Sequence, residues 1–344
     1  MRFGSALLIA LQALAQSGET PPERLHVVAT LPVLADLARQ VGGDLVEVRS
    51  LGRGSEDPHH VLPTPSLMSA VNRADLFVEL GLSLELWAEN VLDGARNPRI
   101  RRGARGHVFA SEGIPRKGVP ATVSRAGGDL HPEGNPHLWM DPVLARAMVR
   151  NIAVGLKRIA PEDRERIDKR LASVERRIDE SLFGKELVEL LGGDVLSRLA
   201  LNGRLRRFLA EKSFRGRKLA DRLGGWLGKA EPLRGKRIVF YHESWVYFAD
   251  RFGLEVVDHV ERKPGIAPSA AHKEKLIAEI REKRVPVIGV LTYYDDSVPR
   301  ALARETGASV VVLPGTVGAV AEARDYFALV DTVLDRLLEV FQNR

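Results

Sequence analysis

The chain has 344 residues, 44% of them hydrophobic, which is enough to bury one large core or two moderate ones. Its 51 basic and 45 acidic residues are interspersed along most of the sequence, a pattern that argues against a nucleic-acid-binding protein. It contains no cysteine, so it forms no disulfide, and any metal site must use nitrogen and oxygen ligands.

The N-terminal residues have the pattern of a secretion signal. Arg2 gives a positive start, residues 6–15 form an apolar run, and Ala13 and Ala15 are the small residues that precede a cleavage position before Gln16. The run is too short to span a bilayer. We therefore predict a signal peptide over 1–15 and export to the periplasm. We expect no lipid anchor, because no cysteine is present to carry one.

Residues 25–142 alternate between strand and helix patterns, which predicts an N-terminal α/β lobe with a mainly parallel sheet. Short apolar runs predict strands over 25–29, 45–50, 76–80 and 107–110, and helical periodicity predicts helices over 32–41, 65–73 and 83–92.

Residues 143–182 predict a long connecting helix, with a break near Pro161, and residues 183–232 predict a helical insert. The alternation then resumes in a C-terminal α/β lobe over 233–344. The predicted fold class is α/β, with two doubly wound lobes joined by the connecting helix and a metal site in the cleft between them. The expected strands of the second lobe are 237–241, 255–260, 285–291 and 309–313, and its expected helices are 244–252, 269–282, 297–306 and 322–341.

Three histidines occupy loop positions next to predicted strands or helices. His59 lies in the loop after the second strand, His137 directly precedes a helix, and His242 follows the strand that ends at Tyr241. Ligands bind outside the carboxyl ends of the strands in open parallel sheets. Imidazole is a good ligand for zinc and other first-row metals, so we predict a zinc site at these residues.

The fourth ligand is open at this point. Asp295 follows a strand of the second lobe at the matching position, and we favour it, although it could instead cap the following helix. Water is a further possibility, and His131 is a candidate accessory or outer-shell group. The other candidate ligands are Asp296, Glu56 and Asp57.

Several segments, taken in order, resemble the zinc/manganese substrate-binding proteins of bacterial metal-uptake ABC transporters, the cluster A-I receptors. The resemblance implies two lobes joined by a long helix, and metal held in the cleft by His59, His137 and His242. It also implies delivery to a membrane permease. The sequence departs from the family at 313–318, where many members place an aspartate and this chain has no carboxylate. The resembling segments are Asp57–His59, Arg73–Trp87, Asn135–Pro142, Tyr241–Phe248 and Lys263–Ser269.

The predicted function is capture and delivery of Zn²⁺ by a monomer, without catalysis and without nucleic acid. A Mn²⁺ or Fe²⁺ receptor of the same fold is one alternative, and an adhesin-like surface protein is another. An exported zinc hydrolase with Glu243 as its base belongs to a different class. His242-Glu243 begins like the zinc-protease motif, but position 246 is valine, so the second helical ligand is missing.

Overall fold

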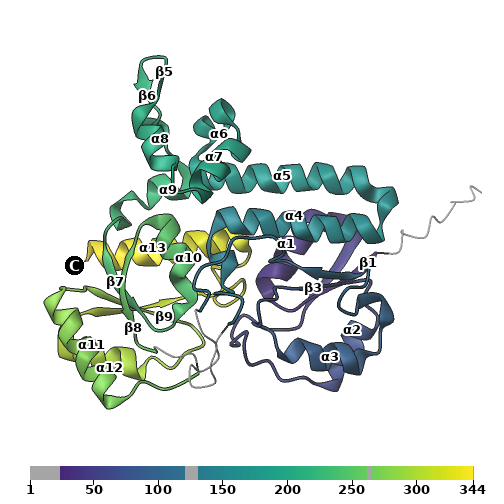
Figure 1. Ribbon diagram of the computed structural model, residues 1–344, viewed down its shortest axis with the longest axis horizontal. Helices are drawn as coiled ribbons and strands as arrows, with labels where there is room; N and C mark the ends of the chain where they lie inside the picture. Colours follow the sequence, from purple (N-terminus) through teal and green to yellow (C-terminus); the bar gives the residue numbers. More distant parts are fainter. Residues whose placement is uncertain (1–23, 121–130, 262–264, 344) are drawn as a thin grey trace, which may run out of the picture.

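The computed structural model describes residues 24–120, 131–261 and 265–343. It contains two lobes, each with a four-stranded parallel sheet (Figure 1). The strand orders are β2-β1-β3-β4 and β10-β9-β7-β8. Read from the opposite edge, the second order repeats the first. The strands are β1 (Leu25–Ala29), β2 (Val46–Ser50), β3 (Leu76–Glu79), β4 (His107–Phe109), β7 (Arg237–Phe240), β8 (Glu255–His259), β9 (Val287–Leu291) and β10 (Ser309–Leu313).

The predicted alternation of strands and helices is confirmed, and burial explains it. Every residue of β3 and β9 is buried, as expected for central strands that are covered on both faces. Prolines begin several helices, where a missing N–H is tolerated. The helices of the two lobes are α1 (Pro32–Gly42), α2 (Pro65–Asn72), α3 (Trp87–Ala95), α10 (Val246–Phe252), α11 (Ala270–Glu282), α12 (Ser297–Thr306) and α13 (Tyr326–Gln342).

The connection between the lobes is a pair of helices. α4 (Pro142–Ile159) packs against α1 and against strands β3 and β4, and α5 (Arg164–Phe183) returns alongside it (Figure 1). The turn between them contains Pro161, where the sequence predicts the break. One cluster of buried side chains runs through both lobes and this helix pair, so the connection is part of the core.

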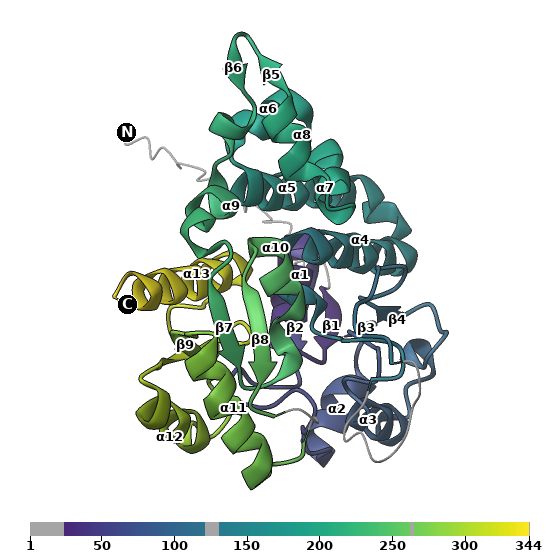
Figure 2. The same ribbon diagram turned by 60° about the vertical axis from the view of Figure 1, so that its left-hand side comes forward.

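The insert after α5 projects away from both sheets (Figures 1 and 2). It begins and ends at the same place, because Gly224 N donates to Phe183 O over 3.1 Å. Its elements are α6 (Lys185–Leu191), α7 (Gly193–Leu201), α8 (Leu205–Glu211), β5 (Ser213–Phe214) and β6 (Arg217–Lys218), and α9 (Gly225–Lys229) leads back to the second lobe.

Two predicted helices begin later than expected. The helix predicted from residue 83 begins at Trp87, because Leu82 and Ser83 have φ of 58° and 59°, outside the helical range. The helix predicted from residue 322 begins at Tyr326, where Asp325 accepts a hydrogen bond from Ala328 N and caps it. Among the described residues, we find no helix that is both long enough and apolar enough to cross a membrane.

Candidate metal centre

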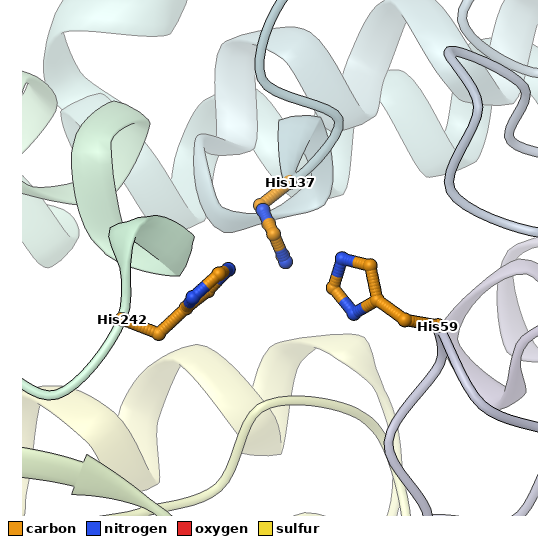
Figure 3. A group of neighbouring side chains, drawn as sticks. All are labelled: His59, His137 and His242. Atoms are coloured by element: carbon orange, nitrogen blue, oxygen red, sulfur yellow. The ribbon is translucent and has the colours of Figure 1, made fainter. Parts of the chain in front are cut away.

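The three predicted histidines come together between the lobes. His59 comes from the loop after β2, His137 from the turn before α4, and His242 from the end of β7 (Figure 3). One potential ligand atom from each lies within 4.8 Å of the other two. The ring centroids form a nearly equilateral triangle with sides of 5.5, 5.8 and 5.6 Å. Tetrahedral zinc with Zn–N bonds of about 2 Å requires imidazole centroids about 5 Å apart, so a small contraction would complete the geometry.

The Nδ1 atom of each histidine faces an oxygen. His59 Nδ1 is 2.7 Å from Asp57 Oδ1, His137 Nδ1 is 3.1 Å from Asn135 Oδ1, and His242 Nδ1 is 3.7 Å from Glu261 Oε2. For His59 and His137, the acceptor at Nδ1 fixes the tautomer and leaves the lone pair on Nε2, whereas His242 Nδ1 has no hydrogen-bond partner. His137 Nε2 is buried and has no hydrogen-bond partner, so it is a free base held inside the cluster.

The cluster is buried, and burial decides its protonation. His137 is 1% exposed and His242 is 3% exposed. Burial and the nearby His59 and His242 hold the pKa of His137 well below its ordinary value, so its ring is neutral. For Asp57, burial opposes ionisation, but the hydrogen bond and charge of His59 outweigh it and lower the pKa of that carboxyl. The centre therefore combines a neutral imidazole at His137 with an ionised carboxylate at Asp57.

The segment that carries His137 is held by the second lobe. Asn135 Nδ2 donates to Glu243 O over 2.9 Å, and Tyr247 Oη donates to Asn135 O over 2.7 Å. Further along, Trp139 Nε1 donates to Gly315 O over 2.8 Å. His137 is therefore fixed relative to His242, and the loop that carries His59 is the part of the triangle with fewer cross-lobe contacts.

His131 is a fourth histidine beside the triangle. Its Nε2 lies 3.2 Å from His59 Nε2, and its ring centroid is 6.4 Å from that of His137. Burial, followed by the charges of His59 and His242, lowers its pKa to about 4, while the backbone of Leu82 and Ser83 acts in the opposite direction. The ring is therefore neutral at neutral pH and can donate a lone pair.

The structure does not bring the favoured fourth ligand, Asp295, into this group. Asp295 is exposed, and its Oδ1 accepts a hydrogen bond from Ser297 N at the start of α12. Asp296 pairs with Arg300, and Glu56 pairs with Arg53. Among the described residues, these carboxylates lie outside the group of potential ligands, and Asp57 contacts His59 from its Nδ1 side.

Glu261 is a residue of the site that the sequence analysis missed. It is 5% exposed and lies two residues beyond the end of β8. A carboxylate just past the carboxyl end of a parallel strand was the signal that could have identified it. Its other oxygen accepts a hydrogen bond from Gly265 N, so the carboxylate is held in place behind His242.

Two α/β lobes with a buried ligand cluster between them define the class of extracytoplasmic substrate-binding proteins. A family model described as "Zinc-uptake complex component A periplasmic" matches residues 27–181 and 224–340. The chain belongs to this family of transporter substrate-binding proteins.

The relatives agree in fold and differ in the metal that their names state. The high-affinity zinc uptake system protein ZnuA of Bacillus subtilis is 26% identical over 90% of this chain and 84% of its own length. The manganese ABC transporter substrate-binding lipoprotein PsaA of Streptococcus anginosus is 20% identical over 98% of this chain and 96% of its own. A crystal structure of ZnuA has the same fold, with a TM-score of 0.66 and 22% identity over 92% of this chain and 99% of its own.

Proposed function

We propose that this protein captures Zn²⁺ through Nε2 of His59, His137 and His242 and delivers it to the membrane permease of an ABC transporter. The observation that carries the proposal is the triangle of three imidazoles, with oxygen acceptors at Nδ1 of His59 and His137 and the Glu261 carboxylate 3.7 Å from Nδ1 of His242. Imidazole ligands suit zinc, whereas Mn²⁺ prefers carboxylate, carbonyl and water oxygens. The name of the Bacillus relative also supports zinc.

We propose His131 as the fourth ligand in place of Asp295. Its Nε2 is already 3.2 Å from His59 Nε2, close to the nitrogen–nitrogen separation of about 3.3 Å expected around tetrahedral zinc. The ring of His131 is neutral. The turn at Leu82 and Ser83 contacts the segment that carries His131, since Ser83 Oγ donates to Glu133 Oε2 over 3.3 Å. Four ligands close the coordination sphere, which fits a carrier better than a hydrolase, because a hydrolase needs an open position for water.

Capture requires little movement of the lobes. The His137 segment and His242 are already fixed to each other. Binding of the ion therefore requires movement mainly of His59 and His131. We therefore expect small-angle scattering profiles of metal-free and metal-loaded protein to superimpose closely. Residues from both lobes bind the ion, so zinc should raise the melting temperature.

We also propose that the mature protein acts in the periplasm as a monomer, without a lipid anchor. The predicted signal peptide over 1–15 lies outside the described residues. The family description supports a periplasmic location.

The test is zinc titration of the metal-free mature protein by calorimetry, with metal analysis, for the parent and His137→Ala. We expect one tight zinc per chain, and a loss of affinity in the variant beyond the roughly 10–100-fold that removing an outer-shell partner produces. His26→Ala is the matched control, because His26 lies at the start of β1, is half exposed and pairs with Glu47 of β2. Unchanged zinc binding by His137→Ala would move the site elsewhere, and preference for Mn²⁺ over Zn²⁺ would select the manganese alternative.

A further inference from the structure

One stretch of the helical insert has a positive excess equal to that of the whole chain. Residues 204–218 contain seven basic residues and one acidic residue, an excess of six that equals the net charge of +6 of all 344 residues. The basic and acidic residues in the rest of the chain are therefore equal in number. The stretch also lies outside the segments 27–181 and 224–340 that match the family model, so it is an addition to the family's frame.

The basic stretch ends in an exposed hairpin formed by β5 and β6. Arg215 and Gly216 have φ of 49° and 77°, the left-handed pair that a two-residue hairpin turn requires. All residues from 211 to 218 are exposed, whereas Leu219 at the base is 3% exposed and fixes the hairpin to the insert. The tip is therefore a fixed convex point and not a groove.

The charges at this tip are not neutralised within the protein. Among the described residues, no acidic side chain lies within ion-pair distance of Lys212, Arg215 or Lys218, whereas Arg217 is 3.7 Å from Glu186. Phe214 stands beside them with 40% of its surface exposed, and the Arg215 guanidinium lies 5.2 Å from its ring. An exposed aromatic ring surrounded by unpaired cations is the composition of a membrane-interface contact.

The hairpin lies far from the metal centre. In both views β5 and β6 form the outer end of the insert, with the helices of the insert between them and the second lobe (Figures 1 and 2). The histidine triangle lies between the lobes, beyond α4 and α5. A surface engaged at the hairpin therefore leaves the cleft free.

We infer that residues 212–218 bind the anionic headgroup surface of a lipid bilayer. A convex tip with cations before β5, in the turn and on β6 matches a flat, deformable anionic surface, whereas an acidic protein would need a groove shaped to receive it. The basic residues supply the attraction, and Phe214 inserts at the headgroup boundary.

Sedimentation with vesicles tests the inference. The full-length mature protein is mixed with phosphatidylcholine vesicles containing 30% phosphatidylglycerol, and with pure phosphatidylcholine vesicles. We expect binding to the anionic vesicles only, at low salt, and release at about 1 M salt, where charges are screened beyond about 3 Å. Each basic residue near an anionic surface strengthens binding about fivefold, so the triple variant K212Q/R215Q/K218Q should bind on the order of a hundredfold more weakly.

A matched triple variant separates a local site from bulk charge. R73Q/R96Q/R101Q makes the same charge change at three exposed arginines of the N-terminal lobe. It should retain nearly all of the vesicle binding. Equal loss of binding in both triple variants would overturn the hairpin site in favour of general electrostatic attraction. Equal binding to neutral vesicles, or binding to neither kind of vesicle, would overturn the inference that the hairpin binds an anionic bilayer.

The absence of cysteine from the chain allows a single probe to locate the contact. Ser213→Cys at the hairpin and Ala301→Cys on α12 are each labelled with a dye whose emission shifts to the blue in an apolar environment. Anionic vesicles should shift the emission at position 213 and leave position 301 unchanged. A shift at 301, or no shift at 213, would contradict insertion of the tip.

Discussion

Asp57 lies behind His59 and accepts two hydrogen bonds from the same residue. Its Oδ1 is 3.0 Å from His59 N and 2.7 Å from His59 Nδ1, so it sets both the loop conformation and the tautomer of the ring. Asp57→Asn keeps an acceptor oxygen and removes the charge, which should weaken zinc binding about tenfold, since a carboxylate makes the imidazole a stronger ligand. Glu56→Gln is the control for calorimetric titration, because Glu56 pairs with Arg53. Equal losses in the two variants would mean that only overall charge matters.

The two candidates for the fourth ligand make opposite predictions. His131→Ala should lower zinc affinity at least about tenfold if the ring completes the coordination sphere. Asp295→Ala should leave zinc affinity unchanged and slightly lower the melting temperature, because Asp295 Oδ1 accepts a hydrogen bond from Ser297 N at the start of α12. Titration and thermal unfolding of both variants separate the two ligand sets, and the reverse result would restore Asp295.

The sequence located His59, His137 and His242 because each is joined to the end of a strand or the start of a helix, and those ends meet between the lobes. Asp295 occupies an equivalent position in the sequence. Its carboxylate, however, points to the first turn of α12, where it accepts a hydrogen bond from Ser297 N. The position of His131 depends on contacts between loops distant in sequence, such as Ser83 with Glu133, and periodicity carries no information about them.

At the scale of elements, the turn after β3 is built around a buried carboxylate. Glu85 is 3% exposed and accepts hydrogen bonds from Thr30 Oγ1, Leu80 N and Gly81 N. Burial, followed by the nearby charge of Glu79, raises the pKa of Glu85 to about 7. The raised pKa belongs to the folded state, so this residue contributes stability that is present below about pH 4.5 and is lost as the pH rises through 7.

Glu85→Gln should therefore become relatively more stable as the pH rises. Glutamine imitates the protonated acid, so the difference in unfolding free energy between variant and parent should shift by about 2 kcal/mol in favour of the variant between pH 5.5 and pH 8. Denaturant unfolding at the two pH values measures it. Asp75→Asn, at an acid that is 25% exposed and pairs with Arg99, is the control and should show a much smaller shift. A constant difference would mean that Glu85 is ionised in the folded protein throughout this range.

The turn after β3 also shows why sequence patterns alone do not predict where every helix begins. Strands such as β9 are predictable because all of their residues are apolar and buried. The helix expected from residue 83 is delayed because Leu82 and Ser83 adopt left-handed backbone, at a cost of about 1–3 kcal/mol each. The buried hydrogen bonds of Glu85 offset that strain, and those bonds join segments that are distant in the sequence, such as Thr30.

At the scale of the whole molecule, the lobes are already joined without metal. Arg251 contacts both oxygens of Asp141 at 2.8 Å, and Tyr326 N donates to Asp36 Oδ2 over 2.9 Å, so helices of one lobe hold helices of the other. A single buried core continues across the boundary. A metal ion bound by the three histidines would therefore add bonds to an assembled cleft, which favours small rearrangements of the loops near His59 over rotation of the lobes.

The buried side chains of the insert belong to this same core, but its two ends meet, which allows its removal. A Cβ placed on Gly184 would lie 2.8 Å from Gly224 Cα, so the two ends almost touch, and joining Gly184 directly to Gly224 should close the chain without a linker. The deletion removes the Asp194 carboxylate from Arg146 and the Ala200 carbonyl from Arg251, and both contacts support the helix pair. The melting temperature should therefore fall.

Zinc affinity of this deletion variant should equal that of the parent, because no residue of 185–223 lies among the histidines or their oxygen acceptors. Calorimetric titration of the two proteins at one temperature, well below both melting temperatures, makes the comparison. Since zinc binds the folded state, it should also raise both melting temperatures by a similar amount. A folded deletion variant with weaker zinc binding would show that the insert sets the spacing of the lobes, because no direct contact could transmit the effect.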